Sequence, residues 1–226
     1  MLSKYLYEIS NNKNGIEMGG PSDNGLLIYQ NANIIDNVIF SKNTVWCNNE
    51  TNENNEYKYY ENKVGKVIIN DAVDIPVIKD EQYDFVFSSH LLEHIANPLK
   101  AIKEWLRIIK KDGYLIIIVP EKSICFDHKR NYSKFSTLLE QYEKNVGEDD
   151  LSSLKEILMN HDLSQDIPAG TFEQFTKRCL DNFNNRCMHH YVYDDNLLLE
   201  ICNFFNCIYI YHETYGINRW FIIKKQ

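Results

Sequence analysis

The amino-acid sequence predicts an α/β fold in which helices cover a mainly parallel sheet. Short apolar segments typical of strands alternate with connections long enough to hold helices, the pattern of parallel strands joined by right-handed crossovers. One of these segments, residues 83–88, is almost continuously apolar, as expected of a strand covered on both faces. In an open sheet of this kind, ligands bind outside the carboxyl ends of the strands.

The first half of the chain contains four of the expected strands. A short amphipathic helix is expected over residues 3–10, followed by an Asn-Asn-Lys-Asn-Gly turn. The Asn-rich stretch 47–62 is polar and is expected to be an exposed loop. The strand candidates are Gly15–Met18, 33–40, Val64–Asn70 and 83–88.

Residues 97–112 carry the clearest helix pattern in the chain. Asn97 is suited to cap the first turn, and Pro98 is suited to the first helical position. Apolar residues then recur at spacings of three and four, and Gly113 is expected to end the helix. A fifth strand is expected over Tyr114–Val119.

The segment 121–190 has no strong strand pattern, and helical periodicity recurs within it. It is far longer than the few-residue loops usual in such folds, and long insertions at the ligand face form lids or substrate walls. We therefore expect one domain, residues 1–226, with 121–190 as a helical insertion and substrate lid after the fifth strand. The expected helices of the insertion are 134–144, 150–160 and 171–183.

The chain is expected to close with a helix and a strand pair. Asp194 or Asp195 would cap the helix, which runs through Phe205. The two strands are expected over 207–212 and 217–223, with a turn at Tyr215-Gly216.

Composition excludes several classes of protein. Lysine and arginine total 24 and aspartate and glutamate total 32, so the net charge is −8 and a nucleic-acid partner is not expected. The longest apolar runs, such as Leu115–Val119, are far shorter than the ~20 residues of a membrane span, and no signal peptide is recognised. None of the six cysteines forms a C-x-x-C pair, which argues against a zinc ribbon. We predict a cytoplasmic protein and leave its oligomeric state open, with a dimer among the alternatives.

Three features fall where strands of the predicted sheet end. Residues 15–22 read Gly-Ile-Glu-Met-Gly-Gly-Pro-Ser, a strand followed by small residues whose backbone a ligand can approach; an ordinary tight turn is the alternative. Asp36, near the end of the second strand region, can accept hydrogen bonds from ribose hydroxyls, unless it is simply a solvated loop residue. Asp71-Ala72 follows the third strand and can pair with an adenine amino group and ring. The G-x-G-x-x-G pattern of a dinucleotide site is not present.

With the segment from Asp84 to His94, the chain resembles the class I S-adenosylmethionine-dependent methyltransferases. The similarity is to a type 11-like bacterial and viral subgroup whose members often occur among glycan-biosynthesis enzymes. It extends over about residues 14–130 and returns at the last strands. The stretches that carry it are GIEMGGPS, INDAVDIP, YDFVFSSHLLEHIANPLKAIKEWLRIIKKDGYLIIIVP and FDHKR.

This resemblance implies a fold and a set of cofactor contacts. The fold would be Rossmann-like, with seven strands and the last strand antiparallel. S-adenosylmethionine would be the cofactor, with its amino-acid part and ribose near the turn after the first strand, its adenine near Asp71-Ala72 and its sulfonium near Ser89-His90. The usual third glycine of the first turn is replaced, so a stiffer turn and a Ser22 hydroxyl facing the cofactor carboxylate are expected. The implied cofactor-binding residues are Glu17, Gly19, Gly20, Pro21, Ser22, Asp36, Asp71, Ala72, Ser89 and His90.

The expected reaction is O-methylation of a sugar or nucleotide-linked sugar. The resemblance implies this acceptor class, because members of the subgroup often occur among glycan-biosynthesis enzymes. A sugar hydroxyl is a poor nucleophile and gains about 10²–10⁴-fold from a general base, a role that histidine suits. His128 and His94 are the two candidates, and Asp127 is placed to interact with substrate or a neighbouring base. The pair His189-His190 could reach over the site, although paired loop histidines are more often surface residues.

Four alternatives stay open at this point. The acceptor could be a small amine, or the domain could be a catalytically silent cofactor-binding module. His90, Glu93 and His94 have the HxxEH spacing of a zinc peptidase, which would require a helix here and a third ligand. A methyltransferase with a metal at these residues and His128 is similar to the Glu-x-x-Glu-His arrangement of ubiquinone and small-RNA methyltransferases. We predict no metal.

Overall fold

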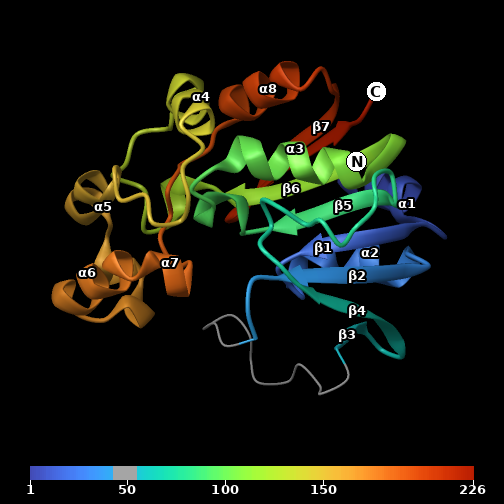
Figure 1. Ribbon diagram of the computed structural model, residues 1–226, viewed down its shortest axis with the longest axis horizontal. Helices are drawn as coiled ribbons and strands as arrows, with labels where there is room; N and C mark the ends of the chain where they lie inside the picture. Colours follow the sequence, from blue (N-terminus) through green and yellow to red (C-terminus); the bar gives the residue numbers. More distant parts are fainter. Residues whose placement is uncertain (43–54) are drawn as a thin grey trace.

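The computed structural model describes residues 1–42 and 55–226, and within them the strands form a single sheet. The strand order is β3-β4-β2-β1-β5-β6-β8-β7, and Figure 1 shows the part from β3 to β6. The strands are β1 (Asn14–Met18), β2 (Ile34–Ile39), β3 (Glu56–Tyr60), β4 (Lys63–Ile69), β5 (Tyr83–Ser89), β6 (Ile109–Pro120), β7 (Ile208–Tyr215) and β8 (Asn218–Lys224).

The sheet is parallel at its centre and antiparallel at both sides. Strands β4, β2, β1, β5 and β6 pair in parallel. Strand β8, the last in the chain, runs antiparallel between β6 and β7, which confirms the predicted direction of the final strand. The predicted number of seven strands is wrong, because the described residues form eight, with β3 added antiparallel to β4 at one edge.

Strand β3 overturns part of the loop expected over 47–62. Residues 47–54 lie outside the described residues, but Glu56–Tyr60 is a strand in which Tyr57 and Tyr59 are buried. The two tyrosines alternate with more exposed neighbours, which is the period-two pattern of a half-buried strand. Because the surrounding residues are polar, the alternation of the two tyrosines was not recognised as a strand pattern in the sequence.

Helices cover both faces of the sheet (Figure 1). Helices α1 and α2 pack on one face, where Leu6, Ile28 and Tyr29 join the core under β2, β5 and β6. Helices α3, α4 and α8 lie over the other face, where Trp105, Leu138 and Leu198 are buried. Their bounds are α1 (Leu2–Ser10), α2 (Leu26–Asn31), α3 (Pro98–Ile108), α4 (Phe135–Glu143) and α8 (Asp195–Phe204).

Helix α3 begins as predicted but ends early. The Asn97 side chain accepts a hydrogen bond from the Lys100 N–H (3.2 Å), and Pro98 is the first helical residue. The helix ends at Ile108, because Ile109 already pairs with Tyr83 of β5 and begins β6. Gly113 therefore lies within a strand and does not end the helix, since pairing to the sheet outweighs the local helix pattern.

The stretch between β6 and α8 contains α4 and three further α-helices. Helices α5, α6 and α7 lie off the end of the sheet (Figure 1). They enclose a small core of their own around Ile157, Phe175 and Met188. Their bounds are α5 (Leu154–Asn160), α6 (Phe172–Leu180) and α7 (Asn182–Asn185). Among the described residues, none of the helices combines the length and apolar character that crossing a bilayer requires.

Candidate active site

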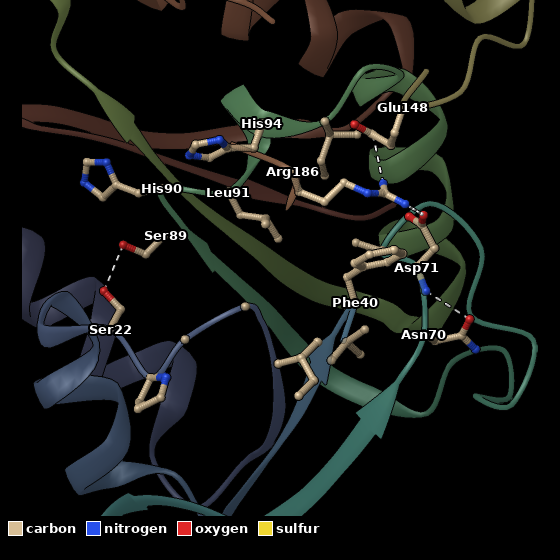
Figure 2. A pocket seen from close by; sticks show the side chains of 17 residues that line it. Ser22, Phe40, Asn70, Asp71, Ser89, His90, Leu91, His94, Glu148 and Arg186 are labelled. Carbon is tan, nitrogen blue, oxygen red and sulfur yellow. Dashed lines mark hydrogen bonds and ion pairs between the residues drawn. The ribbon is translucent and has the colours of Figure 1, made fainter. Parts of the chain in front are cut away.

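A pocket of about 320 Å³ lies where the parallel strands end (Figure 2). The segments that follow four neighbouring strands form most of its wall, and the stretch between β6 and α8 contributes Glu148 and Arg186. The segments predicted to hold the cofactor thus meet around one space. The lining residues are 19–22 after β1, 38–40 at the end of β2, 70–72 after β4, and 89–91 and 94–95 after β5.

The turn after β1 needs glycine at two positions. Gly19 and Gly20 have φ angles of +78° and +81°, in the left-handed region that favours glycine. A Cβ atom on Gly20 would lie 2.2 Å from the Glu17 carboxylate. The Ser22 hydroxyl, predicted to face a cofactor carboxylate, donates a hydrogen bond to the Ser89 hydroxyl (2.9 Å) and so joins this turn to the end of β5.

Glu17 lies beneath this turn and does not line the pocket. Its side chain is fully buried, and one carboxyl oxygen accepts hydrogen bonds from the hydroxyls of Tyr29 (2.7 Å) and Tyr57. Burial raises the pKa of Glu17 to about 8, so the group is mostly neutral at pH 7. The structure therefore places Glu17 as a support under the glycine pair, whereas the sequence placed it against the cofactor.

Asp36 lies within β2 and not at its carboxyl end. Strand β2 continues three residues beyond Asp36, and Phe40 lies in the pocket wall instead. The Asp36 carboxylate accepts hydrogen bonds from the Lys66 N–H (2.9 Å) and the Tyr83 hydroxyl (2.7 Å). Asp36 thus lies inside β2, three residues before the strand ends, and its contact with ribose hydroxyls stays a prediction.

Asp71 lies in the pocket, and both of its oxygens have partners. One accepts from the Val73 N–H (3.2 Å), and the other pairs with Arg186 (3.1 Å). The Arg186 guanidinium lies 3.8 Å from the Phe40 ring centroid and 3.5 Å from a Glu148 oxygen (Figure 2). None of these three partners was predicted from the sequence: Phe40 adjoins a predicted strand end, whereas Glu148 and Arg186 belong to no recognisable local motif.

His90 and His94 bring two imidazoles to the other end of the pocket. A ring nitrogen of His90 lies 2.7 Å from the Asn218 amide oxygen. Burial opposes a charge on this ring, but the Glu93 carboxylate and the Asn218 amide outweigh it and raise the pKa of His90. Burial, reinforced by neighbouring His189, lowers the pKa of His94 to about 3, so this imidazole is neutral at physiological pH.

Comparison with known proteins places this architecture in a described class. Residues 30–117 match the sequence model of a family described as a methyltransferase domain. The match covers 88 of the 226 residues, and the fold around it is that of class I S-adenosylmethionine-dependent methyltransferases. The methyltransferase-domain match and the shared fold support an enzyme whose cofactor is S-adenosylmethionine, in agreement with the predicted enzyme class and cofactor.

The fold is similar to that of solved structures from several organisms. A methyltransferase from Mesorhizobium loti has 6% identity and a TM-score of 0.59, over 99% of this chain and 96% of that chain. One from Methanosarcina mazei has 12% identity and a TM-score of 0.57, over 98% and 96%. One from Aquifex aeolicus has 12% identity and a TM-score of 0.54, over 99% and 87%.

A curated relative covers only part of the domain. The Methanocaldococcus jannaschii protein MJ1123, named as uncharacterized, is 39% identical over 74 residues, or 31% of this chain. The match spans 36% of the length of that relative.

The structure separates the predicted catalytic residues. His94 lines the pocket, but His128 lies outside the lining, about a third exposed, with a ring nitrogen 2.8 Å from an Asp162 oxygen. Asp127 is buried and binds Arg130 (3.1 Å) and His189 (2.6 Å). Its neighbouring histidine in space is therefore His189, not His128.

The pair His189-His190 is buried, which corrects the expectation of surface residues. The His189 ring packs edge-on against His94, with centroids 4.4 Å apart. The His190 N–H donates to the Glu93 carbonyl (2.8 Å). Both histidines thus join the chain before α8 to the segment after β5.

That segment does not form the helix that the zinc-peptidase alternative requires. Leu92–His94 is a single 3₁₀ turn, preceded by His90 with a φ angle of +50°. The two histidines of the HxxEH string consequently have different neighbours. His90 faces Asn218, whereas His94 faces His189.

Proposed function

We propose that the protein transfers a methyl group from S-adenosylmethionine to a small or glycan-linked acceptor, with a sugar hydroxyl as the acceptor group. The observation that carries the proposal is the meeting of the turn after β1, Asp71-Ala72 and Ser89-His90 around one pocket at the carboxyl edge of the sheet. The resemblance to glycan-associated methyltransferases supports the choice of a sugar.

The pocket fits the cofactor at three places. The left-handed glycine pair allows a close approach to the backbone, which suits the amino-acid part together with Ser22. Asp71 and Ala72 would contact the adenine, with the aromatic ring of Phe40 beside them. Ser89 and His90 would border the sulfonium. When bound, the cofactor supplies an electrophilic methyl group.

The acceptor end of the pocket is the wall around His90 and His94. Methyl transfer requires the acceptor oxygen to be held in line with the methyl group and shielded from water. Leu91 and Ile95 give this wall apolar cover. The neutral imidazole of His94 can contact a hydroxyl without placing a positive charge near the sulfonium. We propose that the acceptor lies against His94.

Calorimetry with S-adenosylhomocysteine tests the cofactor pocket. We expect one molecule to bind per chain, and an absence of heat at millimolar ligand would contradict the assignment. A panel of nucleotide-linked sugars and small amines, with formation of S-adenosylhomocysteine as the readout, then identifies the acceptor. Turnover with amines alone would contradict the proposed sugar hydroxyl.

Two histidine variants test the acceptor wall. We expect His94→Ala to lower turnover by about 100-fold, the scale of misplacing a reacting group, with little change in affinity for S-adenosylhomocysteine. His128→Ala should keep most of the turnover, because His128 lies outside the pocket lining. The opposite order of the two effects would move the acceptor site toward His128.

A further inference from the structure

Glu93, His94 and His189 form a buried cluster beside the proposed acceptor wall. Each offers one potential ligand atom, and these atoms lie within 4.8 Å of one another. Glu93 and His94 belong to the 3₁₀ turn after β5, whereas His189 comes from the chain before α8. Only the folded chain brings the three together.

The Glu93 carboxylate is buried, with the His90 ring as an ion-pair partner but without a hydrogen bond from the described residues. Its side chain is 2% exposed, and within the described part of the chain neither of its oxygens has a hydrogen-bond partner. The His90 Nδ1 atom lies 3.6 Å from a Glu93 oxygen, beyond hydrogen-bond distance. Buried carboxylates are normally paired or bind a metal ion.

A second carboxylate orients His189. Asp127 accepts a hydrogen bond from Nδ1 of His189 at 2.6 Å, and Arg130 holds Asp127 in place (3.1 Å). With the proton on Nδ1, the lone pair that can bind a metal is on Nε2. A carboxylate behind an imidazole in this way is the usual outer support of a metal-binding histidine.

We propose that Glu93, His94 and His189 bind one divalent transition-metal ion, with zinc the ion that the donor set favours. Two imidazoles and one carboxylate are a common zinc ligand set, whereas Mg²⁺ prefers oxygen donors alone. Because His94 also lines the pocket, the ion would lie at the acceptor wall, where it could lower the pKa of a hydroxyl. That role rests on the proposed function; binding of the ion does not.

Zinc titration of tag-free protein, stripped with a chelator, tests the site. We expect one equivalent to bind, and Glu93→Gln and His189→Ala each to weaken the zinc affinity by about 100-fold or more. Asp127→Asn should weaken it by about 10–100-fold, the usual effect of losing an outer-shell partner. His161→Ala is the matched control, since His161 is a buried histidine that pairs with Asp166 outside the cluster, and it should bind as the wild type does.

Cobalt(II) provides a second readout that does not depend on the stability of a variant. In the wild-type protein, cobalt should give the visible absorption of a low-coordinate nitrogen and oxygen site, and zinc should displace it. Absence of zinc binding by the wild type, or binding that survives both Glu93→Gln and His189→Ala, would overturn the proposal. Binding of S-adenosylhomocysteine is measured on the same metal-free protein, so failure of the metal site and failure of the cofactor pocket are separate results.

Discussion

Single residues set the shape of the pocket floor. The turn at Gly20 passes directly over the Glu17 carboxyl group, so position 20 has no room for a side chain. Glu17 in turn is held by two tyrosine hydroxyls, one from α2 and one from β3. The pocket floor therefore depends on a buried polar group that a ligand need not touch.

Gly20→Ala should damage cofactor binding. Alanine in the left-handed region costs about 1–2 kcal/mol, and its Cβ would also collide with Glu17. We expect affinity for S-adenosylhomocysteine to fall at least about tenfold, measured by calorimetry. Gly216→Ala is the control, because Gly216 also has a positive φ but no atom lies within 4 Å of its Cβ position. Equal losses of affinity in both variants would contradict this explanation.

Glu17 should make stability depend on pH. Its pKa is about 8 in the fold against an ordinary value of 4.5, so the folded state holds the proton more tightly. This contribution is complete below about pH 4.5 and is lost as the pH rises to about 8. Relative to Glu17→Gln, the wild-type free energy of unfolding should fall by up to about 1.4 kcal/mol per pH unit in that window.

Urea unfolding of both proteins from about pH 5 to about pH 8.5 measures this difference. A difference between wild type and Glu17→Gln that stays constant with pH would show that Glu17 titrates at its ordinary pKa. Comparing the two proteins at each pH removes the contribution of every other titrating group that they share.

Among the secondary-structure elements, the residue that caps α3 also links this helix to α4. Asn97 caps α3 with its side-chain oxygen and also donates a hydrogen bond to the Gln141 carbonyl of α4 (3.3 Å). One side chain thus begins a helix that covers the sheet and attaches the first helix of the following stretch. The capping role was visible in the sequence, but the contact with α4 was not.

Asn97→Ala should destabilise the fold through both contacts. Loss of the cap costs about 1 kcal/mol, and loss of the bond to Gln141 adds about another 1 kcal/mol. Asn97→Ser, which keeps a capping oxygen but not the amide, should lose roughly half as much. Chemical denaturation measures both variants, and equal losses would show that the cap contributes little.

At the scale of the whole molecule, Arg130 holds the 121–190 stretch together. It is buried and pairs with Asp127 and Glu156, and it donates to the carbonyls of His189 and His190. These partners come from separate parts of the stretch. Its neighbour Lys129 makes one ion pair, with Asp162, and is half exposed.

Arg130→Ala should therefore be severe and Lys129→Ala mild. Removing Arg130 leaves a buried carboxylate without its cation, a loss of about 3–5 kcal/mol, whereas an exposed ion pair contributes about 0–1 kcal/mol. Thermal unfolding of the two variants measures the contrast. If the two melting temperatures fall equally, Arg130 does not have the central role that its contacts indicate.

Local patterns predicted most of the fold. The central strands, the start of α3 and the cap of α8 at Asp194 follow from periodicity and capping residues, and the structure has them where expected. The errors occur where distant contacts decide the outcome. Ile109 pairs with β5 and shortens α3, and Tyr57 and Tyr59 turn into the core and make β3 a strand.

The sequence by itself determined which segments end at the carboxyl edge of the sheet, because strand pattern and turn residues act over a few neighbouring positions. It thereby predicted that the glycine turn, Asp71 and His90 would share one pocket. Only the tertiary structure decided that Glu17 lies beneath the turn, that Arg186 pairs with Asp71, and that His189 meets His94. These arrangements join residues far apart in the chain, and burial and charge pairing between such residues leave no periodic trace in the sequence.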